Sequence, residues 1–445
     1  MFVCLENHVP ENRKDQIGGC SMKVKDWKER VTTAEFEEKI RPLYAEKAQM
    51  NTARYGALLN LYEKTFSLED DVTLFSAPGR SEIGGNHTDH ERGRVLAASV
   101  DLDTIAAVSR TEDKRISILS EGYPMCTIDL EDLAVRPDEV NTTASLIRGV
   151  AAKFASLGCS VGGFKAVASS TVLPGSGLSS SAAFEVLVGN IINHLFFEDK
   201  ADAVKIAQIG QYAENVYFGK PSGLMDQMAS SVGNLITIDF EDPDNPVVKK
   251  LNVDFEKTGL KLCIINCWAS HADLTDEYAA VPVEEQKVAG FFGKKVLREV
   301  SREEFMDAIP QLRKEFGDRA VLRCIHFYQD NDRVPQQVEA LESGKIDRFL
   351  ELVKASGRSS WMYLQNIVPL GANEHQEMAI ALALCDELLK DRGAFRVHGG
   401  GFAGTCQAFV PEDMIEAFTA RMDELLGEGS CHVLNIRPVG GTVVG

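Results

Sequence analysis

The chain has 445 residues, 44% of them hydrophobic, and a formal net charge of −19 at pH 7. This length and composition are typical of a globular protein with enough apolar residues for two cores, and so for two domains. The negative charge disfavours nucleic acid and acidic membrane surfaces as partners, although a local basic pocket for phosphate is compatible with it. No apolar run reaches the roughly 18 residues of a membrane span, and the opening residues lack the apolar stretch of a secretory signal.

The cysteines are scattered in a way that predicts free thiols. There are ten of them, without a Cys-x-x-Cys pair, and the closest two, Cys263 and Cys267, have no histidine cluster beside them. Reduced, mostly buried thiols and the absence of a zinc site are expected from this spacing. We therefore expect a cytoplasmic protein.

The first 71 residues are expected to form a helical extension beside the first domain. Residues 1–21 are polar and show no clear period, and Met22 is an alternative start. The pattern Thr32-x-x-Glu35 fits a capping box at the start of one helix, and a second helix is expected over residues 52–65.

Strands and helices then alternate over residues 72–240, which we expect to form an α+β domain. Strands are predicted at 72–76, 102–109 and 116–120, the last two paired, and at 163–173 and 235–240. Helices are predicted at 143–157, 182–197 and 201–217, with a new helix starting just before Asp226.

Residues 241–445 are expected to form the second domain. Strands are predicted at 261–267, 406–410 and 432–437, and helices at 302–357 and 376–389. The acidic stretch 273–287 is expected to be solvated.

Residues 174–183 form a glycine- and serine-rich segment between a β-like run and an apolar helix pattern. Its glycines allow the backbone to approach a ligand closely, and the free N–H groups and dipole of a helix start favour phosphate. The serine hydroxyls can cap the helix, bind phosphate oxygens or ligate Mg²⁺. A serine-capped helix after a glycine turn is the alternative, and a Walker loop is excluded because no Gly-Lys-Ser/Thr ends the run.

Residues 77–90 are polar and glycine-rich, which favours a loop and disfavours a packed strand. Arg80 can meet phosphate charge there, and Asn86, His87 and Asp89 can bind hydroxyl groups. A plain surface loop is the alternative interpretation.

Four motifs in this order resemble those of the kinases grouped as galactokinase, homoserine kinase, mevalonate kinase and phosphomevalonate kinase. Residues 79–90 are similar to the Gly-Arg-x-Asn-x-x-Gly-Glu-His-Thr-Asp-Tyr motif of galactokinases, and 174–182 to the ATP loop of the wider family. Residues 221–227 resemble the galactokinase heptad Pro-Cys-Gly-Ile-Met-Asp-Gln, and 400–404 a glycine run beside the nucleotide. The resemblance covers the chain from about residue 72 to the C-terminus.

The resemblance implies an N-terminal α+β domain over 72–240, a ferredoxin-like C-terminal domain over 241–445, and an active site in the cleft between them. It implies an ATP- and Mg²⁺-dependent kinase that phosphorylates the anomeric hydroxyl of a small-molecule sugar, with galactose favoured. The alternatives are a kinase for a C6-altered sugar such as galacturonate, and a non-catalytic sensor of galactose and ATP. The complete Ser179–Ala182 run and the presence of Asp226 favour catalysis. A monomer is expected, with neither nucleic acid nor membrane as a partner.

The same resemblance implies roles for individual residues. Asp226 would be the catalytic carboxylate, and Arg80 would keep it ionised and stabilise phosphoryl oxygens. Ser179 and Glu214 would hold Mg²⁺. The ATP-loop residues would be Pro174, Gly175, Ser176, Gly177, Leu178, Ser179, Ser180, Ser181 and Ala182. The sugar-binding residues would be Glu82, Asn86, His87, Asp89, Gly223 and Tyr278.

Each of these roles has a structural alternative. Asp226 can be a helix cap, Arg80 a member of a surface ion pair, and Glu214 a solvent-facing residue of an amphipathic helix. The chain also departs from the galactokinase pattern: the phosphate loop is one residue shorter, His90 replaces Tyr, and Glu82 and Asn86 stand where Asn and Glu are usual. Asn86 therefore replaces a carboxylate that meets the 6-hydroxyl of the sugar. Either Glu82 supplies that carboxylate or the pocket admits a C6-altered sugar.

Overall fold

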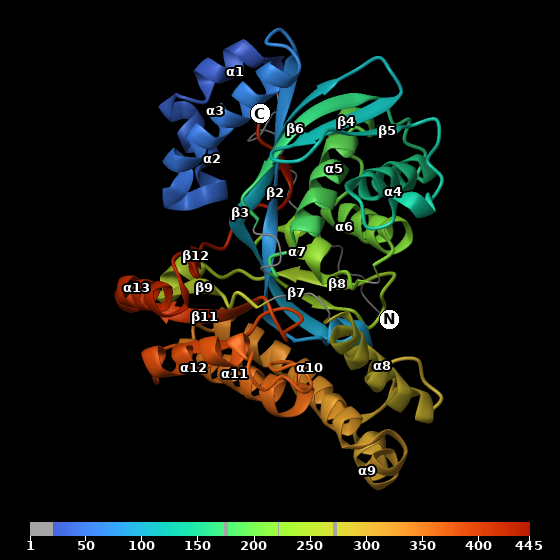
Figure 1. Ribbon diagram of the computed structural model, residues 1–445, viewed down its shortest axis with the longest axis vertical. Coiled ribbons are helices and arrows are strands. Elements are labelled where there is room, and N and C mark those ends of the chain that lie inside the picture. The colour runs from blue at the N-terminus through green and yellow to red at the C-terminus, as the bar shows by residue number, and fades with distance from the viewer. Residues whose placement is uncertain (1–20, 173–176, 221, 270–273) are drawn as a thin grey trace, which may run out of the picture.

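The computed structural model describes residues 21–172, 177–220, 222–269 and 274–445, and Figure 1 shows its two sheets with the helices around them. The N-terminal extension forms helices α1 (Val24–Arg30), α2 (Ala34–Tyr44) and α3 (Ala48–Thr65), which pack on one face of the large sheet. The expected capping box is wrong, because Thr33 is the N-cap of α2 and its hydroxyl accepts a hydrogen bond from the Phe36 amide.

The large sheet has nine strands, and its main order is β1-β2-β3-β6-β4-β5, with β7, β8 and β13 attached to it. Strand β6 lies between β3 and β4, so the expected direct pairing of those two strands is wrong. The bounds of the strands are β1 Met22–Lys23, β2 Asp71–Gly84, β3 Arg94–Arg110, β4 Arg115–Ser120, β5 Cys126–Asp129, β6 Phe164–Ser170, β7 Leu235–Asp239, β8 Val247–Lys250 and β13 Thr442–Val443.

Strand β2 extends through residues 77–84, where the polar sequence predicts a loop. All its residues from Val72 onward are buried, including Arg80 and Glu82. Buried charges are tolerated where they are paired, and both side chains have charged partners from distant parts of the chain. The polarity of this segment therefore reflects internal pairing and not exposure to solvent.

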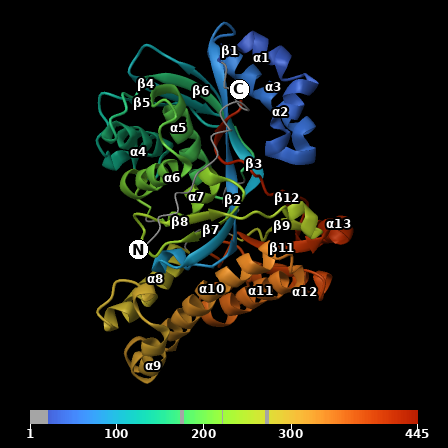
Figure 2. The ribbon, with the colours of Figure 1, turned by 180° about the vertical axis from the view of Figure 1, so that it is seen from behind.

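The other face of the large sheet is covered by α4 (Thr143–Ser156), α5 (Ser180–Phe196) and α6 (Ala203–Tyr212), which share a core with it. Figure 2 shows the same layering from behind, with α1–α3 and α4–α6 on opposite sides of the strands. Helix α6 continues as a π-helical turn (Ala213–Phe218), and α7 (Met225–Val232) then places Asp226 at its first turn. The helices predicted at 143–157, 182–197 and 201–217 are thus confirmed.

The second sheet is antiparallel, with the order β10 (Ala394–Val397), β11 (Thr405–Pro411), β9 (Leu260–Asn266) and β12 (Cys431–Leu434). A helical segment connects β9 to β10, and α13 (Ile415–Leu426) connects β11 to β12. This chain order is the β-α-β-β-α-β pattern of a ferredoxin-like fold, as predicted.

The helical segment between β9 and β10 lies beside this second sheet and extends beyond it (Figure 1). Its first helix, α8, covers the acidic stretch that was expected to be solvated, and it buries Val281, Glu285 and Val288. The bounds of its helices are α8 Thr275–Phe291, α9 Arg302–Phe316, α10 Asp318–Glu342, α11 Ile346–Ser359 and α12 Glu377–Leu389.

Strand pairing extends the large sheet beyond residue 240, because β8 pairs with β7, and the C-terminal strand β13 returns to pair with β2. The divisions at residues 71 and 240 stay predictions. Among the helices in the described part of the chain, none is both long and apolar enough to cross a membrane.

Candidate functional site

Arg80 and Asp226 form a two-point ion pair between β2 and the first turn of α7. Arg80 Nε donates to Asp226 Oδ1 at 2.6 Å, and Arg80 Nη2 lies 2.6 Å from Asp226 Oδ2. Arg80 also donates to the Gly177 carbonyl of the phosphate loop. The arginine side chain is 8% exposed and the aspartate 24% exposed, so the carboxylate is the member of the pair that a ligand can reach.

The surroundings of Asp226 keep it ionised. Burial raises the pKa of this carboxyl, but the charge and hydrogen bonds of Arg80 and the hydroxyl of Ser179 lower the pKa by more, so it lies below its ordinary value. Ser179 Oγ donates to Asp226 Oδ2 at 2.6 Å. Asp226 is therefore more than a helix cap, because its carboxylate accepts hydrogen bonds from Arg80 and Ser179. Arg80 is not part of a surface ion pair, because its side chain is buried.

Ser179 lies at the N-cap of α5 with a left-handed backbone (φ 59°), and its side chain makes no capping hydrogen bond because it points to Asp226. Gly177 also has positive φ, and a Cβ there would lie 2.9 Å from His398 Nδ1. The Arg80 amide donates to the Leu178 carbonyl at 3.0 Å and fixes this part of the loop on β2. Pro174, Gly175 and Ser176 lie outside the described residues, as does Pro221.

Glu214 is buried on the π-helical turn, so the solvent-facing alternative is wrong. Its Oε2 accepts hydrogen bonds from Ser222 Oγ at 2.6 Å and Gln227 Nε2 at 2.8 Å. Its Oε1 lies 3.2 Å from Lys220 Nζ and accepts a hydrogen bond from Ser181 Oγ at 3.3 Å. The structure therefore joins Glu214 to Ser181, whereas Ser179 is joined to Asp226.

The sequence interpretation gave no role to Glu185, or to Gln227 at the end of the 221–227 heptad. Gln227 Nε2 donates to Glu185 Oε2 at 2.9 Å as well as to Glu214, so one amide group connects two buried carboxyl groups. Glu185 is the one acidic residue in the apolar helix α5. An acidic residue in such a pattern is a signal that could have pointed to it.

Asn86 is fully buried, and protein groups use both ends of its amide. Its Nδ2 donates to Glu82 Oε1 and to the Gly399 carbonyl, and its Oδ1 accepts hydrogen bonds from Ser360 and Asn366. An amide has two donors and accepts two hydrogen bonds, so this side chain has no free capacity for a sugar hydroxyl. Asn86 connects the segment after β2 to the C-terminal domain.

Glu82 forms a buried ion pair with Arg396 of β10. Burial raises the pKa of Glu82, although the Arg396 charge and hydrogen bond oppose that shift. Arg396 is 0% exposed, and its Nε and Nη1 have no partner within the described residues. Glu82 and Asn86 thus belong to one buried network.

His87 and Tyr278 both contact the glycine run at residues 400–404. His87 Nε2 lies 3.0 Å from the Gly400 carbonyl, and the Tyr278 hydroxyl donates to the Gly401 carbonyl at 2.9 Å. Burial, assisted by His90, lowers the pKa of His87 to about 3, and burial raises the pKa of Tyr278 to about 12. Both side chains are therefore neutral near pH 7.

Gly223 lies directly against the carboxylate of Asp89. A Cβ at Gly223 would lie 2.1 Å from Asp89 Oδ2, so a larger residue does not fit without a shift of that carboxylate. Because Gly223 lies three positions before Asp226, this contact brings the end of the 79–90 motif next to the Arg80–Asp226 pair.

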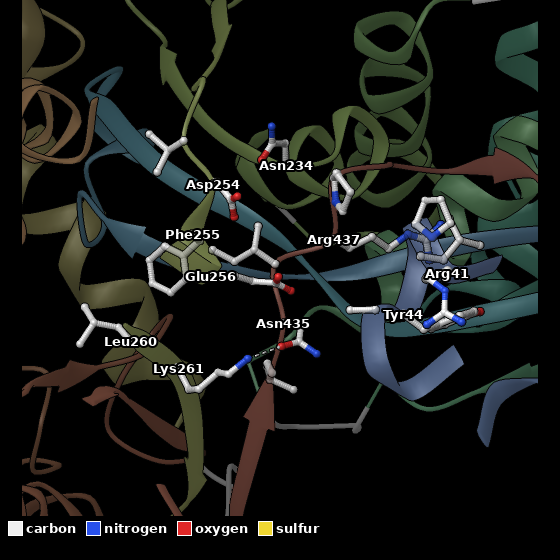
Figure 3. Close-up of a pocket in the computed structure, with 17 residues that line it drawn as sticks. Arg41, Tyr44, Asn234, Asp254, Phe255, Glu256, Leu260, Lys261, Asn435 and Arg437 are labelled. Atoms are coloured by element: carbon white, nitrogen blue, oxygen red, sulfur yellow. Dashed lines mark hydrogen bonds between the residues drawn. The ribbon is translucent and has the colours of Figure 1, made fainter. Parts of the chain in front are cut away.

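A separate cavity of about 330 Å³ lies between the N-terminal extension and the second domain. Figure 3 shows side chains around it, among them Arg41, Phe255, Lys261 and Asn435. None of the predicted site residues lines this cavity, which is therefore distinct from the candidate site.

Two family models match parts of the chain. A model of the N-terminal domain of GHMP kinases matches residues 145–234, which hold α5, Glu214 and Asp226. A galactokinase galactose-binding signature matches residues 60–110, which hold Arg80 and the segment after it. The chain therefore contains a region that matches the GHMP kinase N-terminal domain and a second region that matches a galactokinase signature. It is accordingly a phosphotransferase, and ATP is the typical substrate of the family.

Solved structures of a galactokinase, a mevalonate kinase and a phosphomevalonate kinase share the fold. The galactokinase of Lactococcus lactis, solved with galactose, is 27% identical, with a TM-score of 0.73 over 86% of this chain and 98% of that one. Mevalonate kinase from Methanococcus jannaschii is 14% identical, with a TM-score of 0.58 over 82% and 98% of the two chains. Phosphomevalonate kinase from Streptococcus pneumoniae, also 14% identical, has a TM-score of 0.56 over 81% and 99%. The last two matches support the fold alone.

Proposed function

We propose that this protein transfers the γ-phosphoryl group of ATP to the anomeric hydroxyl of galactose. One observation carries the proposal: an ionised carboxylate, Asp226, lies between Arg80 and the phosphate-loop hydroxyl of Ser179. The galactokinase galactose-binding signature over residues 60–110 supports galactose as the acceptor.

In the proposed reaction, a bond forms between the C1 hydroxyl oxygen and the γ-phosphorus, and the bond between that phosphorus and the β,γ-bridging oxygen breaks to release ADP. Asp226 orients the hydroxyl and receives its proton. A carboxylate with a lowered pKa is a weak base, which suits a loose transition state in which the proton leaves late. Arg80 stabilises charge on the phosphoryl oxygens, because its guanidinium already lies between Asp226 and the phosphate loop.

The residues present fit Mg²⁺ as the metal. Mg²⁺ prefers oxygen ligands and takes few from the protein, because phosphate oxygens and water complete its coordination. Glu214 supplies a buried carboxylate, and Ser179 and Ser181 supply hydroxyl groups at the start of α5. Bound with ATP, Mg²⁺ would neutralise phosphate charge.

For the sugar, we propose His87, Asp89, Gly223 and Tyr278 as the contacts, with Glu82 and Asn86 supporting them from the buried network. One observation favours a second candidate, a sugar with a carboxylate at C6. Arg396 has two guanidinium nitrogens without a partner in the described structure, next to Glu82. Because Glu82 already balances that charge, we favour galactose.

The test is ADP release by the purified protein with Mg-ATP and galactose, compared with the same mixture without sugar. We expect sugar-dependent release of one ADP per sugar phosphorylated. Binding of both galactose and ATP without turnover on any aldose would instead make the chain a sensor.

A further inference from the structure

Three side chains behind the proposed metal site form a buried polar row. Gln227 Nε2 donates to Glu185 Oε2 at 2.9 Å and to Glu214 Oε2 at 2.8 Å. Glu185 is 1% exposed, Gln227 is 0% exposed and Glu214 is 2% exposed. Helix α6 closes the row from one side, because a Cβ at Gly210 would lie 3.1 Å from Glu185 Oε2 and 3.2 Å from Gln227 Cγ.

Two oxygens in this row lack partners. Within the described residues, neither Glu185 Oε1 nor Gln227 Oε1 has a hydrogen bond. If Glu185 were ionised, both would be buried acceptors without donors, and a second negative charge would face Glu214. Lys220, whose charge acts on Glu185, is already paired with Glu214 Oε1. Each unsatisfied buried group would destabilise the fold by about 1–3 kcal/mol.

We propose that Glu185 is a neutral carboxylic acid that holds Gln227, and through it Glu214, in position for the metal. The protonated Oε1 of Glu185 donates a hydrogen bond to Gln227 Oε1, while Glu185 Oε2 accepts one from Gln227 Nε2. A single proton thus gives both unpartnered oxygens a hydrogen bond. The second N–H of Gln227 is then directed at Glu214. This inference rests on the proposed metal role of Glu214.

The electrostatic surroundings of Glu185 favour its neutral form. Burial raises the pKa of Glu185 well above its usual value, and the charges of Glu214 and Asp226 raise it further. The Gln227 hydrogen bond and Lys220 oppose that rise without cancelling it. These effects favour the neutral form of Glu185 and leave Glu214 as the member of the row that can bind a metal ion.

The first test compares Glu185→Gln with Glu185→Leu. The glutamine is neutral and of similar shape, with an oxygen that accepts from Gln227 and an NH₂ that donates to it. Leucine removes both of these hydrogen bonds and leaves Gln227 only its bond to Glu214. Outer-shell partners of metal ligands contribute roughly 10- to 100-fold to metal affinity. We expect Glu185→Leu to raise the Mg²⁺ concentration for half-maximal activity about tenfold or more, with the KM for sugar little changed, and Glu185→Gln to restore most of that loss. Equal losses in both variants, or no change in either, would overturn the proposal.

The second test does not depend on activity. The infrared difference spectrum of wild type minus Glu185→Gln should show the carbonyl band of a protonated carboxyl group at pH 6 and at pH 8. A carboxylate band in its place would overturn the neutral form. Failure of the proposed metal role would be recognised separately, as a Glu214→Gln variant with an unchanged Mg²⁺ titration.

Discussion

Replacing Asp226 by Asn tests the centre of the proposed site. The amide keeps the shape but loses the charge, and its NH₂ would face either Arg80 or Ser179, which both donate to the carboxylate. Loss of a positioned proton acceptor lowers kcat on the order of 10²- to 10⁴-fold, or about 2.7–5.4 kcal/mol in the barrier. Arg80 also loses its charged partner, and because Asp226 is 24% exposed we expect a stability loss of about 2–3 kcal/mol, near the lower end for broken ion pairs.

The assay measures kcat for ADP release and, separately, the Kd of ATP by calorimetry. We expect kcat to fall as stated while the Kd of ATP changes by less than about threefold, because the carboxylate acts on the acceptor hydroxyl. Denaturant unfolding should show a single folded population in both proteins.

Asp239 provides a matched control. Like Asp226, it accepts from two arginine nitrogens, although they belong to two residues, Arg94 Nε at 2.7 Å and Arg298 Nη2 at 3.0 Å, and its side chain is 25% exposed. Asp239→Asn should therefore lose similar stability but keep kcat. If Asp226→Asn retains more than about a tenth of the wild-type kcat, or if Asp239→Asn loses as much, the catalytic assignment of Asp226 is wrong.

Three further predictions concern the metal, the sugar contact and pH. Glu214→Gln should raise the Mg²⁺ requirement about tenfold or more, since it removes a charged ligand, and an unchanged titration would argue against a metal role. Gly223→Ala should raise the KM for sugar by displacing Asp89, whereas Gly290→Ala, where a Cβ meets nothing within 4 Å, should leave it unchanged; equal KM values in all three proteins would exclude the contact. Because the pKa of His87 is lowered to about 3, its contribution to stability is complete above the unfolded-state pKa near 6.5 and is lost as pH falls from there towards 3. Unfolding free energies should therefore fall less steeply with acid in His87→Gln than in wild type, and identical slopes would refute the lowered pKa.

Where the sequence carries a local signal, the fold could be predicted from it. The apolar period of α5 and the Pro–Gly break before α7 predict both helices, and they place Ser179 and Asp226 at helix starts. The two-layer pattern of the second domain also follows from its alternating strands and helices. These features depend on residues that are neighbours in the chain.

The strand conformation of residues 77–84 in β2 could not be predicted, because the partners of its charged side chains are remote in the sequence. Arg80 pairs with a residue 146 positions later and Glu82 with one 314 positions later, and no local pattern reveals such pairs. The role of Asn86 differs from the expectation for the same reason. Its amide makes four hydrogen bonds within the buried network, three of them to residues of the C-terminal domain. Asn86, which stands where galactokinases have a sugar-binding carboxylate, therefore connects the two domains.

Substrate preference tests the central claim most directly. The measurement is kcat/KM for galactose, galacturonate, N-acetylgalactosamine, arabinose and glucose on one enzyme preparation with saturating Mg-ATP. A site that hydrogen-bonds a hydroxyl can reject an analogue without it by up to about 10⁴-fold, so the ranking should be clear. The proposal predicts that galactose has the highest value, with anomeric phosphate as the product. A higher value for galacturonate would contradict it and would point to Arg396, whose Nε and Nη1 have no hydrogen-bond partner among the described residues, as the contact of the C6 carboxylate.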